Sequence, residues 1–168
     1  MIIDNSKVSE LLERLEDLRR YQVNVGVLSS SSGELLMIAN VQEFGASIPV
    51  TDKMRGYFLY EFGVALRKDT TVINIPERSF IRSSFDKNKG KVEQSGEELI
   101  GQVVDGNLSA MDFYNLLGQT CVNAIQDFIR NLSSPPNSGL TVANKGSSSP
   151  LIDTGRLINS IAFEVVSK

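Results

Sequence analysis

The stretch AMDFYNLLGQTCVNAIQDFIRNL, residues 110–132, decides the fold of this chain. Its apolar and small side chains recur every three or four positions, the spacing that places them on one face of an α-helix. We therefore predict a helix with a single apolar face over about five turns. Cys121 lies on this face and is expected to be a small core residue rather than a nucleophile. The face consists of Tyr114, Leu117, Gly118, Cys121, Ile125, Phe128 and Leu132.

Helical periodicity also predicts helices over residues 6–20, 34–44 and 78–104. We expect Gly45 to end the second of these in a left-handed cap, and the third to be broken near Gly90. Residues 53–67 fit either a helix interrupted by glycines or a hairpin, and we favour the helix. Phe80 and Phe85 are predicted to be core residues.

Alternating apolar and polar residues predict strands over residues 21–28 and 161–166. Residues 48–51 and 70–75 are also expected to be extended, and Pro76 closes the latter segment. The predicted fold class is therefore α+β: an antiparallel sheet with helices packed on one side, and a long extended arm or loop before a short C-terminal helix and strand. We expect residues 1–168 to form a single structural domain.

Composition limits the possible functions. The chain has 168 residues, a formal net charge of −3 and a sequence pI near 5.1, which argues against a protein whose main work is to neutralise phosphates. It contains no histidine and one cysteine, which excludes serine-histidine and cysteine-histidine catalysis and zinc sites built from these residues. We expect no enzyme activity and no bound cofactor or metal.

Acidic residues in the first twenty positions stand where a secretory signal would need an apolar run. No apolar stretch approaches the roughly 20 residues that cross a bilayer. We expect a soluble chain that is made and folded in a reducing cytoplasm and does not contact membranes.

Charge is unevenly distributed along the chain. Residues 53–91 hold nine basic and four acidic side chains, whereas residues 93–127 hold six acidic and no basic ones. The two zones are either two solvated faces of a monomer or faces of opposite sign that meet between neighbouring copies in a ring. The sequence leaves both interpretations open.

Residues 133–152 form a polar segment rich in serine and proline, with Lys145 as its only charge before Asp153. One interpretation is a mobile surface connection. The other, which we favour, is an arm that reaches a neighbouring subunit, because such a segment adds little core in return for its ordering entropy. In that case Leu140, Thr141 and Val142 could add as a strand to another subunit's sheet, with Asn137 and Lys145 fixing the path. Asp153 or Thr154 would then cap a short helix that carries Arg156.

Several motifs in this order resemble the pattern of tailed-phage morphogenesis proteins. The resemblance is to the Mu-type virion morphogenesis and tail-completion family, and more loosely to siphophage tail-component and neck proteins, and it runs from Val25 to Ile161. The motifs are TDKMR at 51–55, IPERSFIR at 75–82, Asn137, Thr141, Lys145-Gly146, PLIDTGRL at 150–157 and Ser160-Ile161.

The resemblance implies a structural protein of a tailed bacteriophage or prophage virion, located at the head-tail junction and present in the host cytoplasm during assembly. It would act as a tail-completion, tail-terminator or neck protein that caps the tail and permits joining to the head. Its partners would be other copies of itself in a homo-oligomeric, hexameric ring, the tail tube or sheath protein, and head-tail connector proteins, with DNA at most passing through the lumen. The residues that we expect at interfaces are Arg78, Arg82, Asn137, Leu140, Thr141, Val142, Lys145 and Arg156.

Two functions of other classes stay open. The basic segment from Arg78 to Lys91 could contact DNA, although no aromatic side chains are interleaved as in single-strand binding sites. Carboxylates such as Glu97 with Glu98, or Asp105 with Asp112, could hold a divalent ion, but adjacent helical residues point to different sides.

Overall fold

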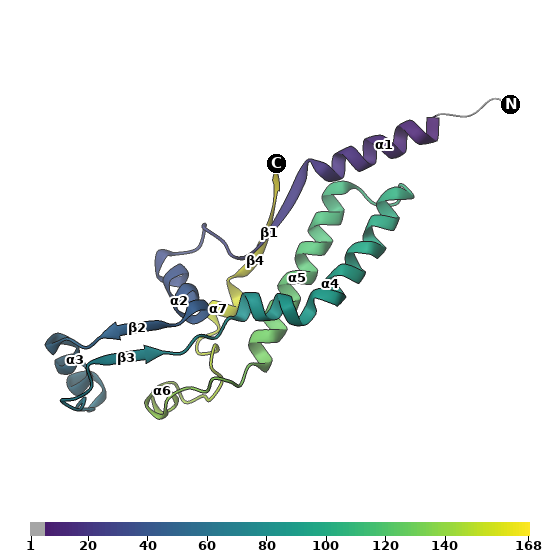
Figure 1. Ribbon diagram of the computed structural model, residues 1–168. Coiled ribbons are helices and arrows are strands. Elements are labelled where there is room, and N and C mark those ends of the chain that lie inside the picture. The colour runs from purple at the N-terminus through teal and green to yellow at the C-terminus, as the bar shows by residue number, and fades with distance from the viewer. Residues whose placement is uncertain (1–5) are drawn as a thin grey trace.

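A computed structural model describes residues 6–168, and its centre is a pair of long helices that lie side by side (Figure 1). They are α4 (Phe80–Val104) and α5 (Ala110–Asn131). The α5 helix confirms the helix predicted from residues 110–132. Its first turn is capped by Ser109, whose hydroxyl accepts a hydrogen bond of 3.1 Å from the Asp112 amide.

One face of α5 packs on a two-stranded antiparallel sheet formed by β1 (Tyr21–Val27) and β4 (Ile161–Ser167). Both strands were predicted. Gly118 of α5 lies at a close approach of the two layers, since a Cβ atom built there would be 2.5 Å from Phe163 Cδ2 in β4. The missing side chain lets helix and sheet approach this closely, as expected for an α+β domain with helices on one side of the sheet.

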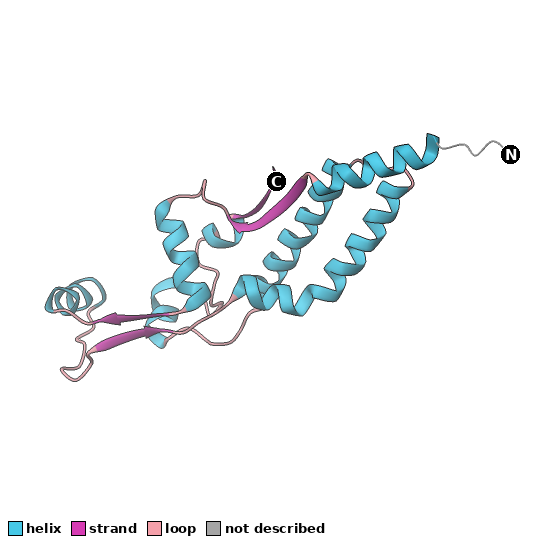
Figure 2. Cartoon of the chain, turned by 45° about the horizontal axis from the view of Figure 1, so that its top comes forward, coloured by secondary structure: helices cyan, strands magenta, loops and turns pink. Residues whose placement is uncertain are grey.

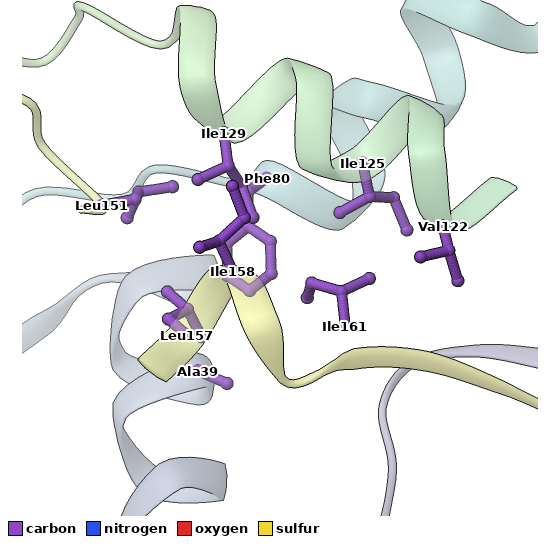
Figure 3. Packing of buried hydrophobic residues seen from close by; sticks show 9 residues of the cluster. All are labelled: Ala39, Phe80, Val122, Ile125, Ile129, Leu151, Leu157, Ile158 and Ile161. Atoms are coloured by element: carbon purple, nitrogen blue, oxygen red, sulfur yellow. The ribbon is translucent and has the colours of Figure 1, made fainter. Parts of the chain in front are cut away.

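The hydrophobic core lies where α5 meets α2 (Gly33–Phe44), α7 (Arg156–Asn159) and the start of α4. Phe80 is completely buried at its centre, as predicted. Phe85, in contrast, is 56% exposed, so its assignment to the core was wrong. Five residues turn an α-helix by roughly 500°, which leaves Phe85 about 140° around α4 from Phe80. Figure 3 shows the cluster: Ala39, Phe80, Val122, Ile125, Ile129, Leu151, Leu157, Ile158 and Ile161.

The remaining strands within residues 6–168 form a second two-stranded antiparallel sheet, so the four strands of this part of the chain are split between two sheets instead of gathered in one. β2 (Ala46–Pro49) pairs with β3 (Val72–Ile75), with Ala46 opposite Ile75. The helix α3 (Asp52–Phe62) lies between them in sequence and at the outer end of this ribbon, which points away from the body (Figures 1 and 2). We call residues 46–75 the projection.

The structure decides the ambiguous segment 53–67 and corrects the break that was expected near Gly90. Residues 53–67 are helical only as far as Phe62, where Gly63 ends α3 with φ = 64° in the left-handed region that favours glycine. The expected break near Gly90 is absent: α4 runs without interruption through it, although its axis bends (Figure 1). A single glycine inside a long helix costs only about 1 kcal/mol, which packing of the rest of the helix offsets.

Two further helices complete the part of the fold that the structure describes. These are α1 (Ser6–Arg19), close to the predicted bounds, and the short α6 (Gly139–Lys145). Between residues 6 and 168, no helix combines the length and the apolar character that crossing a bilayer requires.

Candidate assembly interface

Arg78 is the most constrained of the residues expected at an interface. The residue is 6% exposed, and its guanidinium donates to the carbonyl oxygens of Pro135 and Pro136 at 2.9 and 3.0 Å and to Gln42 Oε1 at 3.0 Å. Its amide also donates to the Gln42 carbonyl at 2.7 Å. Burial lowers the pKa of the guanidinium. Arg78 is therefore a clamp within its own chain, which ties the segment after α5 to α2.

Asn137 and Lys145, which were expected to fix the path of this segment toward another subunit, make hydrogen bonds within the segment itself. Asn137 Nδ2 donates to the carbonyl oxygens of Ser148 and Ser149 at 3.4 and 3.3 Å. Lys145 Nζ donates to the Ser149 carbonyl and, at 2.8 Å, to that of Ile152. Because desolvation dominates at this half-buried ammonium group, the pKa of Lys145 is lowered. The segment is thus folded back on itself.

The edge strand expected at Leu140, Thr141 and Val142 was wrong. These residues lie in the helix α6. The Ser138 hydroxyl accepts a hydrogen bond of 3.2 Å from the Thr141 amide, which caps the helix, and Gly146 ends it at φ = 66°. This local capping satisfies backbone groups that a strand would have offered to another subunit. Leu140 and Val142 are half-buried and Thr141 is exposed.

Arg156 lies at the first turn of α7 and forms a bidentate ion pair with Glu34 of α2, at 3.0 and 3.3 Å. Hydrogen bonds from the guanidinium lower the pKa of Glu34, and the carboxylate raises that of Arg156. Both side chains are more than half exposed, so solvent screens the pair. Arg156 docks α7 on α2 and also keeps a solvent-facing surface.

Arg82 belongs to a charged cluster at the start of α4 that the sequence did not reveal. Glu43, only 5% exposed, accepts hydrogen bonds from the amides of Ile81 at 2.9 Å and Arg82 at 3.1 Å. The Arg82 side chain donates to Glu43 at 3.0 Å and to Glu77 at 2.8 Å. The side chain of Ser79, which precedes α4, does not cap the helix. The carboxylate of Glu43, which belongs to α2, caps the N-terminus of α4 instead.

The basic segment considered for DNA contact is partly consumed by these interactions. Arg78 is buried and Arg82 is paired with two carboxylates. Lys89 lies 3.8 Å from Glu93, and Lys87 Nζ lies 5.8 Å from the centre of the Phe128 ring. Within residues 6–168, acidic and thiol side chains do not gather in threes at any point where a metal ion could be held.

The projection is the largest feature that sequence reasoning missed. Half of its residues are apolar, yet none of them is buried. On α3, Tyr57 is 55% exposed, Leu59 57% and Tyr60 89%. The sequence signal was the run YFLY at 57–60, because four consecutive large apolar residues cannot all face one side of a helix.

The projection is nevertheless an ordered element. Arg55 donates to the carbonyl oxygens of Arg67 and Thr70 at 2.8 and 2.7 Å and so fastens the segment after α3. The rings of Phe58 and Phe62 lie 5.6 Å apart. The exposed aromatic residues are therefore presented on a folded support, which is typical of a surface that another protein covers.

No protein-family model, curated protein or solved structure matches this chain.

Proposed function

We propose that this protein is a structural component of a tailed bacteriophage or prophage virion, which acts at the head-tail interface as a tail-completion, tail-terminator or neck protein. In this role, copies of the chain form a homo-oligomeric ring that caps the tail, contacts the tail tube or sheath protein and permits joining to the head-tail connector. The order and spacing of the motifs from residue 51 to 161 support the assignment.

The observation that carries the proposal is the projection. A segment of thirty residues that is half apolar without a buried side chain gains little by folding alone, because hydrophobic stabilisation follows the apolar area removed from water. Such a segment becomes favourable when another protein covers it. This is what an assembly component requires.

The test is electron microscopy of lysates from a phage with an early stop codon in this gene, with the gene supplied from a plasmid as the control. Filled heads beside separate tails of normal length would indicate completion or joining. Tails of uncontrolled length would indicate termination. Intact, infectious particles without the protein would refute the structural role.

A further inference from the structure

The projection and the segment after α5 are fastened to the body at one place. This junction consists of Gln42 and Glu43, in the last turn of α2, and of residues 77–82 at the start of α4. The chain leaves α2 at Gly45, and β3 leads it back into α4 (Figure 1). The two passes touch, since a Cβ atom built on Gly45 would lie 3.0 Å from the Glu77 amide nitrogen. A movement of the projection therefore acts directly on the junction.

Arg82 holds the projection side of the junction. On the outgoing pass of the chain, its guanidinium donates to the carbonyl oxygen of Glu43 at 2.8 Å and to the carboxylate of the same residue at 3.0 Å. On the returning pass it donates to the Glu77 carboxylate at 2.8 Å. Because one planar side chain binds both passes, it fixes residues 77–79 relative to the end of α2.

Arg78 lies in this fixed stretch and holds the segment after α5. Its amide and its guanidinium donate to Gln42. The same guanidinium donates to the carbonyl oxygens of Pro135 and Pro136 and, at 3.5 Å, to Asn137 Oδ1. Hydrogen bonds weaken steeply when donor and acceptor lose their alignment, and a rigid guanidinium cannot follow acceptors on two elements that move apart. A shift of the stretch therefore loosens its hold on the segment.

The part of the segment that we call the loop, residues 137–149, can open without unfolding the core. None of these residues is buried, whereas Pro150 and Leu151, which follow them, are. The two ends of the loop meet at Asn137, whose Nδ2 lies 3.3 Å from the carbonyl oxygen of Ser149. A compact loop with joined ends and little buried apolar surface opens locally at a low cost in free energy.

We propose that the junction couples the projection to the loop. When the base of the projection is held in place, Arg78 keeps its acceptors and the loop is closed; when the base shifts, Arg78 loses them and the loop opens. A protein that covers and immobilises the projection would shift the equilibrium toward the closed loop. Because both coupled parts belong to one chain, the inference goes beyond the proposed function and does not depend on it.

Hydrogen exchange of the full chain, measured by mass spectrometry, tests the coupling from the projection side. Arg82→Gln removes hydrogen bonds to Glu43 and Glu77, which lie outside the loop. We expect the amides of the loop to exchange about ten-fold faster, the effect of losing one charged hydrogen bond. Arg130→Gln is the matched control, because it breaks an exposed ion pair of 2.7 Å with Asp127 outside the junction. Exchange in the loop should be unchanged by it.

Gly118→Ala separates the coupling from a general loss of stability, because it crowds Phe163 where α5 meets β4, outside the junction. A loop that opens locally exchanges independently of global unfolding, so this variant should leave exchange in the loop unchanged. Loop exchange that is unaffected by Arg82→Gln would overturn the inference. So would loop exchange that Gly118→Ala and Arg82→Gln accelerate equally.

The reverse experiment starts from the loop, since a coupling free energy acts in both directions. Asn137→Ala unfastens the ends of the loop, and we expect faster exchange in β2 and β3 of the projection. Asn144→Ala is the control, an exposed position within the same loop. Equal exchange of these strands in the two variants would overturn the inference. This comparison decides the question even where Arg82→Gln fails to fold.

Discussion

Replacing Gly118 by alanine places a methyl group in a close contact between α5 and the sheet. A Cβ atom there would be 2.5 and 2.6 Å from Cδ2 and Cγ of Phe163 and 3.0 Å from Val23 Cγ2. Carbon atoms prefer separations of about 3.5–4.0 Å, so the ring would have to retreat by about 1 Å. Rotation about χ2 leaves Cγ in place, so relief of the contact requires either a change of χ1 away from its packed rotamer or a shift of strand β4.

Two effects of opposite sign set the magnitude. Alanine is favoured over glycine inside a helix by about 1 kcal/mol. Overpacking of a core contact typically costs about 1–3 kcal/mol, and a contact this short belongs at the upper end. We expect a net destabilisation of about 2 kcal/mol, which for a chain of this size lowers the melting temperature by roughly 4–8 °C.

Gly90→Ala is the matched control, because it makes the same chemical change inside a helix where nothing lies within 4 Å of the new atom. Only the propensity effect remains there, so we expect stabilisation by about 0.5–1 kcal/mol. Urea and thermal unfolding followed by circular dichroism measure both variants. A Gly118→Ala protein as stable as Gly90→Ala would show that α5 and β4 are not in the described contact.

Three further predictions follow from the Arg78 clamp, the Glu43 helix cap and the burial of Cys121. Arg78→Met leaves the carbonyl oxygens of Pro135 and Pro136 without their donor. We expect the free energy of unfolding to fall by about 2–4 kcal/mol and hydrogen exchange in residues 133–155 to become faster. Unchanged exchange would contradict the clamp. Glu43→Gln removes the charge that caps α4 and should lower the free energy of unfolding in urea by about 1–3 kcal/mol. The exposed control Glu77→Gln should change this free energy little. Equal effects of the two variants would argue against the cap. Burial raises the pKa of the Cys121 thiol, so the midpoint of the pH dependence of its alkylation by iodoacetamide should lie at a higher pH than for a free thiol. A midpoint at or below that of a free thiol would refute burial of this group.

The elements with strong periodicity could be predicted from the sequence. Apolar side chains recur at the helical spacing throughout residues 110–132 and alternate throughout residues 21–28 and 161–166. The structure confirms this helix and these strands. Leu140 to Val142 were misread because three apolar or β-branched residues suit a strand as well as a helix. The cap supplied by Ser138, a local hydrogen bond, decides between the two.

The candidate interface was predicted only in part, because its key contacts join residues far apart in sequence. Arg78 and Glu43 are buried polar residues whose roles depend on Pro135 and on the start of α4, and no local pattern reports such pairs. The projection escaped notice for another reason. Periodicity indicates that a face is apolar but does not say whether the rest of the chain covers that face. The rest of the chain leaves Tyr57 and Tyr60 exposed.

The pairing of β1 with β4 has a consequence for how the chain is synthesised. Tyr21 to Val27 find their partners only at Ile161 to Ser167, after every other helix and strand has been made. At about 5–20 residues per second, roughly 2–6 s separate the completion of α5 from the appearance of β4. During that interval the apolar face of α5 has no complete sheet to cover it. The nascent chain is therefore exposed to chaperones and to aggregation until its last strand leaves the ribosome.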